Sequence, residues 1–501
     1  MMQAATGQAR NPQVNTFLSD SPLGLFIGGQ WQPSQRGGTL ATVDPGTGET
    51  LAEVQAAGPE DVDRAVQAAR QAFHRSGWAA MAPNYRGVYL HRLADLVDDR
   101  RDTIAEIESL DVGKPRPQAL WDVGHFSATL RYYADLALHA EYSRPIPLPR
   151  MDARTVRLPW GACGFIFPWN FPFLLYGWGI SPALAAGNTV VIKPAEDTPL
   201  TALYLGRLVQ EAGIPDGVVN IIPGLGETAG AALAGHPGIA RMSFTGSPEV
   251  GKRIAEACGR NLVPVKLELG GKGAAVVFGD VDVEQTVDAL TAAITLNAGQ
   301  VCCTASRWLV DDAIYDRFVE YAADRMGRVH IGYWNDPLTQ MGPLVSQKQM
   351  DRVLGYIAGG RAQGADLLLD GGQTEVVGQP GGFWVKPALM AGGPENVACR
   401  EEIFGPVAYL MRFRTEEEAV DLVNRSEYGL ANSVWTRDLQ RANRVAEAMV
   451  AGNSWINAHN VFAQGLPYGG AKLSGMGGGV LGPETLYDYL RPQSVARPLT
   501  A

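Results

Sequence analysis

The stretch that decides the fold of this chain reads NTVVIKPAEDTPLTALYLGRLVQEAGIPDGVVNII, from Asn188 to Ile222. It opens with a short apolar run, Thr189–Ile192, which is typical of a buried strand. Apolar residues then recur at helical spacing over Leu200–Ala212, and Val218–Ile222 is a second apolar run. A strand, a helix and a strand in this order predict part of a parallel sheet.

Comparable runs continue the alternation on both sides of this stretch. GFIFPW, Gly164–Trp169, is expected to be a strand followed by a loop, and Ser181–Ala186 a helix with Pro182 in its first turn. The next segments are predicted as the helices Gly226–Ala234 and Ser247–Cys258 and the strands Ala240–Phe244 and Val263–Leu267. A second β/α series runs from about Gly273 to Val461. The sequence therefore predicts an α/β protein with a doubly wound parallel sheet.

The N-terminal part and one later segment differ from this alternation. Asp61–Phe73 and Arg86–Leu110 have the spacing of helices. Residues 144–158, RPIPLPRMDARTVRL, begin with prolines and continue with charges that alternate with Val and Leu. This pattern favours an exposed ribbon over a core helix.

Length and charge narrow the class of protein. A chain of 501 residues is too long for one ordinary core, so two or three domains are expected. The net charge is -10 and no basic stripe is present, which argues against nucleic acid or an anionic membrane as the main partner.

The cysteines and the N-terminus bear on the compartment. The five cysteines are an odd, sparse set that predicts no disulfide framework and favours the cytoplasm. They are Cys163, Cys258, Cys302, Cys303 and Cys399. The first residues lack the apolar core of a secretory signal. No CxxC pair or histidine cluster has the spacing of metal ligands, so no metal is expected.

A thiol pair and a carboxylate are the candidates for chemistry. GQVCCTASR, Gly299–Arg307, follows LELGGK, Leu267–Lys272. Either Cys302 or Cys303 offers a nucleophile for a carbonyl carbon, and Glu268 offers a base that takes a proton from water. A buried cysteine that acts only as a small hydrophobic residue is the alternative.

Eight motifs in order extend this pairing over nearly the whole chain. They are FPWNFP (Phe167–Pro172), NTVVIKPAE (Asn188–Glu196), PGLGETAG (Pro223–Gly230), FTGSPEVGK (Phe244–Lys252), LELGGK, GQVCCTASR, EEIFGPV (Glu401–Val407) and PYGGAKLSG (Pro467–Gly475). Together they resemble the aldehyde dehydrogenase superfamily, specifically its hydrolytic, acid-forming members. The resemblance implies a Rossmann-like NAD-binding domain over residues 1–140 and 159–269 and an α/β catalytic domain over 270–470. It also implies a β-ribbon oligomerisation element over 141–158 and 485–501, and a homodimer or homotetramer.

The resemblance also assigns the chemistry. Cys302 matches the nucleophile, which attacks an aldehyde to give a thiohemiacetal. Asn170 and the backbone N–H of Cys302 match the donors that stabilise the developing oxyanion. Hydride then passes to a nicotinamide, and Glu268 matches the base that activates water to hydrolyse the thioester. Relatives that pass the acyl group to coenzyme A commonly lack this carboxylate.

The cofactor implied by the resemblance is NAD, with NADP as a weaker alternative. Lys193 and Glu196 match the pair that holds the adenosine ribose, and a carboxylate there repels a 2′-phosphate. Ser247 caps the helix near the pyrophosphate. The remaining candidates in this set are Trp169, Gly226, Glu402 and Phe404.

The substrate funnel is the least determined part of the site. Six residues match positions that line it, namely Phe171, Trp178, Val301, Cys303, Phe462 and Tyr468. Such a funnel suits an apolar or aromatic aldehyde, or a cation held against π faces, and the sequence leaves both open.

Two positions depart from the family pattern. Gly179 and Gly479 stand where many relatives carry a Lys and a Glu that help to relay the proton collected by Glu268. We expect the two glycines to leave space beside Glu268 for an ordered water chain. The alternative is that apolar side chains fill the gap and raise the pKa of Glu268.

The predicted function is NAD-dependent oxidation of an aldehyde to the carboxylic acid. One alternative is a catalytically retired scaffold that serves as a structural or binding protein. Another is a thiol esterase or acyl-transferase without hydride chemistry. The presence of Cys302, Glu268 and Asn170 together with Lys193 and Glu196 argues against both.

Overall fold

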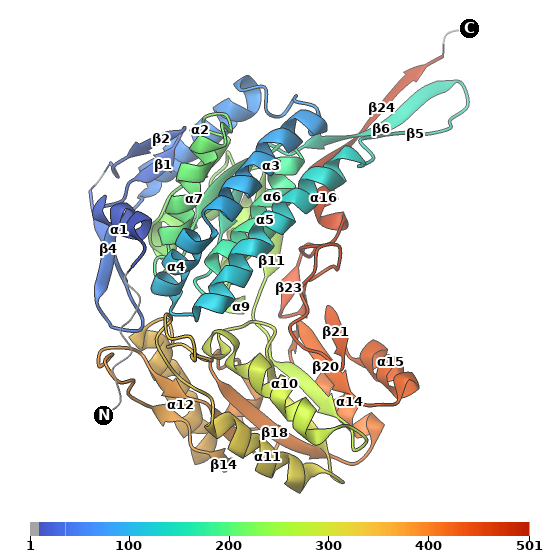
Figure 1. The fold of residues 1–501 in the computed structure, drawn as a ribbon. Coiled ribbons are helices and arrows are strands. Elements are labelled where there is room, and N and C mark those ends of the chain that lie inside the picture. The colour runs from blue at the N-terminus through green and yellow to red at the C-terminus, as the bar shows by residue number, and fades with distance from the viewer. Residues whose placement is uncertain (1–9, 36, 500–501) are drawn as a thin grey trace.

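Two large sheets organise the chain in a computed structural model that describes residues 10–35 and 37–499 (Figure 1). The first sheet contains, in spatial order, β2 (Gln30–Gln32), β1 (Leu25–Ile27), β9 (Val219–Ile221), β8 (Thr189–Lys193), β7 (Ala162–Ile166), β10 (Arg241–Thr245), β11 (Val265–Glu268) and β23 (Gly475–Met476). Its five central strands, from β9 to β11, are parallel, and both of its edges pair antiparallel. The expected parallel sheet is therefore confirmed.

Helices cover both faces of the first sheet. They are α2 (Pro59–Arg75), α3 (Pro83–Asp99), α4 (Arg101–Val112), α5 (Arg116–Leu138), α6 (Pro172–Ala185), α7 (Leu200–Glu211), α8 (Ala231–Ala234) and α9 (Pro248–Arg260). In β8, Val190 and Ile192 pack into the core beneath α3–α7, whereas Val191 packs into the core beneath α2 and α9. Alternate residues of a strand point to opposite faces, so an all-apolar strand is what two covered faces require.

The second sheet repeats this plan in the C-terminal half. It contains β14 (Asp366–Leu369), β17 (Ala388–Ala391), β18 (Val407–Phe413), β13 (Ala305–Asp311), β12 (Gly273–Val277), β20 (Ala431–Trp435) and β21 (Asn453–Ile456), and only β14 pairs antiparallel among these described strands. Its helices are α10 (Val283–Thr295), α11 (Tyr315–Gly327), α12 (Gln347–Ala362), α13 (Val397–Arg400), α14 (Glu416–Asn424) and α15 (Leu439–Ala448). Trp308 and Leu309 of β13 enter the cores on opposite faces.

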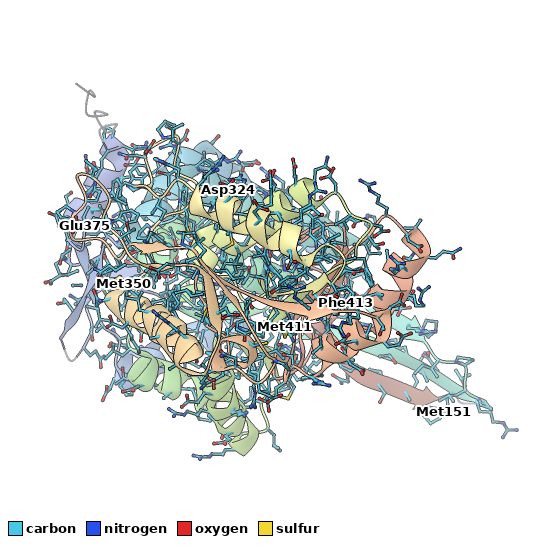
Figure 2. All side chains as sticks on the ribbon, turned by 90° about the horizontal axis from the view of Figure 1, so that it is seen from below. Met151, Asp324, Met350, Glu375, Met411 and Phe413 are labelled. Carbon is cyan, nitrogen blue, oxygen red and sulfur yellow. The ribbon has the colours of Figure 1, made fainter. Side chains whose placement is uncertain are left out.

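A three-stranded ribbon projects from the body (Figure 1). It consists of β5 (Ser143–Pro145), β6 (Met151–Pro159) and β24 (Leu490–Pro498), and β24 pairs with β6 along its whole length. Figure 2 shows Met151 well away from the packed body. The predicted ribbon at 144–158 thus gains its third strand from the far end of the sequence. A short helix, α16 (Glu484–Asp488), leads into β24.

The remaining elements are small. They are the N-terminal helix α1 (Pro12–Ser19), the pair β3 (Thr39–Val43) and β4 (Thr50–Gln55), the pair β15 (Gly372–Gln373) and β16 (Val385–Lys386), and the pair β19 (Tyr428–Gly429) and β22 (Ala471–Lys472). Over residues 10–35 and 37–499, no helix combines the length and the apolar character that crossing a membrane needs. The predicted domain boundaries stay predictions, and residues 1–9 and 500–501 of those ranges lie outside the described residues.

Two predicted helices differ in the structure. The helix expected over Ser181–Ala186 begins at Pro172, so Pro182 lies inside α6 and not in its first turn. The burial of almost every side chain of α6 outweighs the cost of an internal proline. The helix expected over Gly226–Ala234 begins as a π-helical turn, η1 (Gly226–Gly230), and only its last turn, α8, is α-helical.

Candidate active site

The loop that carries Cys302 is held by an unusual backbone. It follows a short 3-10 turn, η2 (Leu296–Gly299), and precedes β13. Asn297 and Ala298 have φ of 46° and 53°, and Gly299 has φ of 73°. A Cβ atom on Gly299 would lie 2.2 Å from the backbone of Gly405, so only glycine fits this turn. The turn places Cys302 and Cys303 just before the start of β13.

The two glycines of LELGGK let that loop approach Glu268. A Cβ atom on Gly271 would lie 2.3 Å from the carbonyl oxygen of Cys302. A Cβ atom on Gly270 would lie 2.2 Å from the Glu402 carboxylate, which accepts a hydrogen bond from the Gly271 N–H at 2.7 Å. The glycine pair therefore brings the end of β11, the Cys302 loop and Glu402 together.

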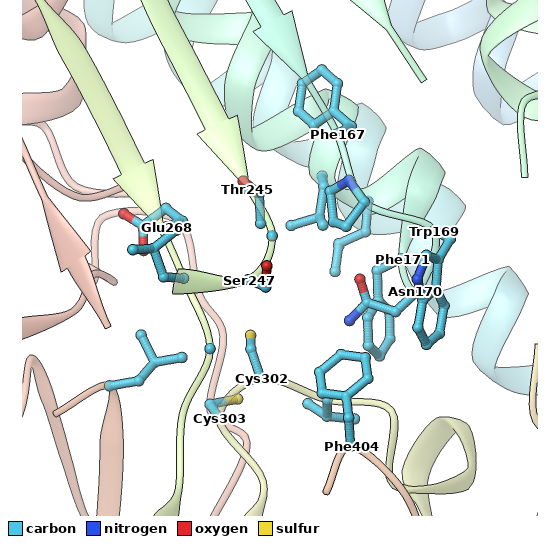
Figure 3. Close-up of a pocket in the computed structure, with 18 of the residues that line it drawn as sticks. Phe167, Trp169, Asn170, Phe171, Thr245, Ser247, Glu268, Cys302, Cys303 and Phe404 are labelled. Carbon is cyan, nitrogen blue, oxygen red and sulfur yellow. The ribbon is translucent and has the colours of Figure 1, made fainter. Parts of the chain in front are cut away.

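Most of the predicted site residues line a single pocket of about 440 Å³ between the two sheets (Figure 3). They are Trp169, Asn170, Phe171, Trp178, Ser247, Glu268, Val301, Cys302, Cys303, Glu402, Phe404, Phe462 and Tyr468. Lys193, Glu196 and Gly226 lie outside this lining and form a separate group.

The pKa values of the two adjacent thiols, Cys302 and Cys303, are shifted in opposite directions. A hydrogen bond from the Cys303 side chain is the main cause that lowers the pKa of Cys302, and a hydrogen bond from Tyr468 adds to it. Burial raises the pKa of Cys303 well above its usual range. The Cys303 Sγ also lies within hydrogen-bonding distance of Asn460 Oδ1, at 3.4 Å. Because the thiolate is the nucleophilic form, Cys302 is the better nucleophile of the two.

Asn170 is held by one hydrogen bond from its side chain and one to its backbone. Its side-chain nitrogen donates to the Gln300 backbone carbonyl at 2.9 Å, and its backbone carbonyl accepts from the Asn297 side-chain amide at 2.8 Å. A side-chain amide has two N–H donors, so one stays available. In the view of Figure 3 the Asn170 amide points toward the Cys302 thiol. Among the described residues no protein group accepts the Cys302 backbone N–H, which is a second available donor.

Glu268 ends β11 and is buried without a hydrogen bond to its carboxylate from the described residues. Burial raises the pKa of Glu268 well above its usual range, and the neighbouring Cys302 charge raises it further. The positive charge of Lys266 acts in the opposite direction. A carboxyl with a raised pKa is suited to take a proton near neutral pH.

Other atoms lie close to Gly179 and Gly479, the two glycines that depart from the family pattern. A Cβ atom on Gly179 would lie 2.8 Å from the ring of Phe167, which stacks on Phe165. A Cβ atom on Gly479 would lie 2.4 Å from the Tyr468 carbonyl. A larger side chain at either position would collide with these neighbours, whereas Gly179 itself lines the pocket together with Glu268, so the water chain stays a prediction. The raised pKa of Glu268 agrees with the alternative of a dry surrounding.

The second group of residues fits the ribose of a dinucleotide. Lys193 ends β8 and its Nζ lies 2.7 Å from Glu196 Oε2, while the Gly226 N–H approaches Glu196 Oε1 at 3.4 Å. Burial raises the pKa of Glu196, but Lys193 outweighs burial and leaves it lowered. The ionised carboxylate stays 38% exposed, so it is free to accept hydrogen bonds from ribose hydroxyls.

The other cofactor candidates lie at the rim of the pocket. Ser247 caps α9 by accepting from the Val250 N–H at 3.3 Å, which leaves other N–H groups of that first turn for an anion. Burial raises the pKa of Glu402 to about 7. Phe404 meets Trp169 edge to face, with ring centroids 5.3 Å apart. Gln349 and Arg352 donate to the backbone carbonyls of Phe404 and Glu402 and fix this segment.

Aromatic rings surround the approach to Cys302. Trp178 lies 5.5 Å from Phe462 and 5.3 Å from Tyr468 between ring centroids, and Phe462 lies 5.7 Å from Tyr468. The Trp178 indole N–H donates to His125 Nδ1 at 3.2 Å. Burial lowers the pKa of His125 to about 4, so this histidine is neutral at pH 7. Leu174, Leu175 and Val480 complete the apolar lining.

Sequence reasoning missed two charged residues beside the site, Lys266 and Asp488. Lys266 is buried two residues before Glu268, and its Nζ lies 3.0 Å from Asp488 Oδ2. The signal was present in the sequence, since a lysine inside the apolar strand Val263–Leu267 conflicts with a plain core strand. The metal prediction is not contradicted, as residues 10–35 and 37–499 contain no group of three His, Cys, Asp or Glu side chains placed to bind an ion.

Comparisons with known proteins place the chain among the aldehyde dehydrogenases. The model of the family described as "Aldehyde dehydrogenase family" matches residues 31–495. The chain is 45% identical to retinal dehydrogenase 2 of Mus musculus, over 90% of this chain and 88% of the relative. It is 42% identical to the mitochondrial aldehyde dehydrogenase of Homo sapiens, over 95% of this chain and 92% of the relative. A structure of an aldehyde dehydrogenase from Bacillus cereus in complex with NAD+ superposes with a TM-score of 0.95 at 38% identity, covering 99% of this chain and 100% of that chain.

Proposed function

The chain belongs to the aldehyde dehydrogenase family, and from that premise we propose how its own residues oxidise an aldehyde to a carboxylic acid with NAD as cofactor. The observation that carries the assignment is the contrast between the lowered pKa of Cys302 and the raised pKa of Cys303 in one pocket with Asn170 and Glu268. A retired scaffold has no need for this arrangement.

The first step is attack by the Cys302 thiolate on the carbonyl carbon. The C–S bond forms as the carbonyl π electrons move to oxygen, which gives a thiohemiacetal oxyanion. The free N–H of the Asn170 amide and the Cys302 backbone N–H are the donors for that charge. NAD, when bound, accepts the hydride that leaves the same carbon. The product of these events on the protein is a thioester at Cys302.

The second step is hydrolysis of the thioester. Glu268 removes a proton from water as the water oxygen attacks the acyl carbon, and the C–S bond breaks to release the acid and the Cys302 thiolate. The raised pKa of Glu268 supports this role, because proton transfer is most effective when the pKa of the base lies near the working pH.

The cofactor is held by two sets of residues. Lys193 and Glu196 bind the adenosine ribose, supported by their 2.7 Å ion pair and the exposure of the carboxylate. The free N–H groups in the first turn of α9, which Ser247 caps, would bind the pyrophosphate, and Gly226 lies beside Glu196. Glu402, Phe404 and Trp169 hold the nicotinamide end.

The substrate is a neutral aldehyde with an apolar or aromatic body. The funnel residues Phe171, Trp178, Val301, Phe462 and Tyr468 are uncharged, as are the leucines and valine beside them. None of these funnel side chains carries a negative charge that would pair with a permanent cation. The relatives named retinal dehydrogenases agree with an apolar substrate.

Assembly and location are also proposed. The projecting β5–β6–β24 ribbon supports a homodimer or homotetramer, because the outer edges of β5 and β24 have no partner strand in one copy, among the described strands. The five cysteines are free, which supports a reducing cytoplasm.

The test is an assay of NADH absorbance with benzaldehyde, hexanal and betaine aldehyde, each with NAD and with NADP. We expect the highest kcat/KM for benzaldehyde or hexanal with NAD. A preference for betaine aldehyde would contradict the neutral funnel, and no NADH with any aldehyde would contradict the proposed chemistry.

A further inference from the structure

A buried lysine lies on the same strand face as Glu268. β11 runs from Val265 to Glu268, and residues two apart in a strand point to one face, so Lys266 and Glu268 share theirs. The Lys266 side chain is 1% exposed. A lysine buried in this way is costly unless its charge is paired, so its partners are informative.

The partners of Lys266 come from the C-terminal segment of the chain. Its Nζ lies 3.0 Å from Asp488 Oδ2 at the end of α16 and donates to the Gly479 carbonyl at 2.6 Å. The Asp488 side chain is 28% exposed. The pair therefore runs from the buried strand face of Glu268 to solvent.

The glycine run before α16 is shaped around this pair. Gly478 has φ of +103°, and a Cβ atom there would lie 2.6 Å from Asp488 Oδ2. The Gly479 carbonyl accepts from both Lys266 and the Thr485 hydroxyl, the latter at 3.2 Å. The absence of a side chain at Gly478 thus leaves room for the Asp488 carboxylate, and the backbone carbonyl of Gly479 binds the Lys266 ammonium.

Few other charges face this pair in the described part of the chain. Arg241 of β10 approaches Asp488 at 4.0 Å, and the Tyr489 ring lies 5.3 Å from the Lys266 Nζ. On the pocket side, Glu268 is influenced by Lys266, Cys302 and Asp488. Lys266 is accordingly the cation that balances Glu268.

Glu268 needs an exit for the proton that it takes from water. Neither carboxylate oxygen of Glu268 has a hydrogen-bond partner among the described residues, so no protein group is in direct contact to take that proton. We propose that Lys266 and Asp488 carry this proton from Glu268 to solvent, as positioning and relay residues for thioester hydrolysis. This inference rests on the proposed function of Glu268.

The transfer conserves protons and charge. Lys266 first gives one of its ammonium protons to the Asp488 carboxylate, 3.0 Å away, and the neutral amine that remains then takes the proton of the Glu268 carboxyl through a bridging water. Glu268 returns to a carboxylate, Lys266 returns to an ammonium, and Asp488 becomes a carboxylic acid that releases its proton to bulk water. Burial lowers the pKa of Lys266, which favours passing a proton on.

The experiment measures hydrolysis of the acyl-enzyme alone. p-Nitrophenyl acetate acylates a reactive thiol without an aldehyde or hydride transfer, and mass spectrometry then follows the decay of acetylated Cys302 against pH. The variants are Asp488→Asn, which keeps the shape of the side chain, and Lys266→Met, which keeps its length. Asp152→Asn is the matched control, since Asp152 pairs with Arg497 at 2.8 Å on the ribbon and is likewise part-exposed.

We expect decay to slow about tenfold or more in both pair variants and to be unchanged in the control. The rising pH limb of the decay should move in opposite directions. Loss of the Lys266 charge raises the pKa of Glu268 and moves the limb to higher pH, whereas loss of the Asp488 charge lowers that pKa and moves it to lower pH. Imidazole, a small proton carrier, should restore decay in Asp488→Asn.

A merely structural ion pair gives a different result. If Asp488→Asn lowers the melting temperature but leaves the decay rate and its pH limb unchanged, the relay is overturned, whether or not Lys266→Met folds. A Glu268→Gln variant that deacylates at the normal rate would instead overturn the proposed function itself. The two failures are therefore distinguishable.

Discussion

The Sγ atom of Cys302 lies 3.3 Å from the phenolic oxygen of Tyr468, a residue 166 positions later in the chain. When Cys302 is a thiolate the phenol is the donor, and this hydrogen bond helps to lower the pKa of Cys302. Tyr468 also packs on Trp178 and Phe462, so the ring that shapes the funnel also stabilises the thiolate. Substrate binding and nucleophile activation therefore share one side chain.

Replacing Tyr468 by Phe is expected to raise the pKa of Cys302 while keeping the funnel apolar. A hydrogen bond to a charged group contributes about 1.5–3 kcal/mol, so its loss should raise the pKa of Cys302 measurably. The rate of iodoacetamide alkylation against pH reports this pKa directly. An inflection that stays in place in Tyr468→Phe would show that the 3.3 Å contact does not stabilise the thiolate.

Cys302→Ala is expected to lose aldehyde oxidation by about a thousandfold or more while NAD binding persists, because the thioester has no other sulfur to form on. Cys303→Ala should keep most of the activity, with a higher pKa at Cys302, since the Cys303 hydrogen bond is the main cause that lowers it. Steady-state rates and NAD titration by fluorescence separate the two effects. Activity that survives in Cys302→Ala and disappears in Cys303→Ala would reverse the assignment.

Glu268→Gln is expected to give one burst of NADH followed by turnover slower by about 10²–10⁴-fold, because acylation proceeds from the thiolate but hydrolysis lacks its base. In the unaltered protein the rate of hydrolysis should rise with pH through the pKa of Glu268. Burial raises that pKa, so the rising limb should lie above the ordinary glutamate value of about 4.3. Stopped-flow measurements across pH test both points, and a limb near the ordinary value would indicate a wet surrounding.

Features of the fold that depend on neighbouring residues could be predicted from the sequence, and features that depend on distant segments could not. The strand Thr189–Ile192 was predictable because burial on both faces demands an unbroken apolar run, which local sequence displays. The π-helical turn at Gly226 and the early start of α6 at Pro172 depend on packing by distant segments, which local pattern does not encode.

The same limit applies within the site. Gly179 and Gly479 were visible as departures, but their neighbours, the Phe167 ring and the Tyr468 carbonyl, come from segments whose approach only the fold determines. The Lys266–Asp488 contact joins positions more than two hundred residues apart, as does the pairing of β24 with β6. A charged residue inside an apolar strand was the one local clue.

Glu196→Ser is expected to relax the preference for NAD over NADP. The Glu196 carboxylate, kept ionised by Lys193, accepts from ribose hydroxyls and repels a 2′-phosphate. A contact of this kind contributes on the order of 1–3 kcal/mol, so the ratio of kcat/KM for the two cofactors should shift by about 5- to 150-fold. Equal use of NADP by the unaltered protein would contradict the role of Glu196.

The ribbon is expected to hold a homo-oligomer together through its exposed apolar tip. Ile146 and Leu148, between β5 and β6, are 37% and 48% exposed, and the outer edge of β24 has no partner strand in one copy, among the described strands. An isolated three-stranded arm with an open edge is only marginally stable, so pairing with a second copy is the favourable state. Ile146→Asp combined with Leu148→Asp should therefore convert the oligomer to monomers in analytical ultracentrifugation.

Leu338→Asp is the control, because Leu338 is 70% exposed but lies far from the ribbon in sequence and should leave the oligomer intact. A double variant that sediments like the unaltered protein, or an unaltered protein that sediments as an active monomer, would rule out the ribbon as the assembly element.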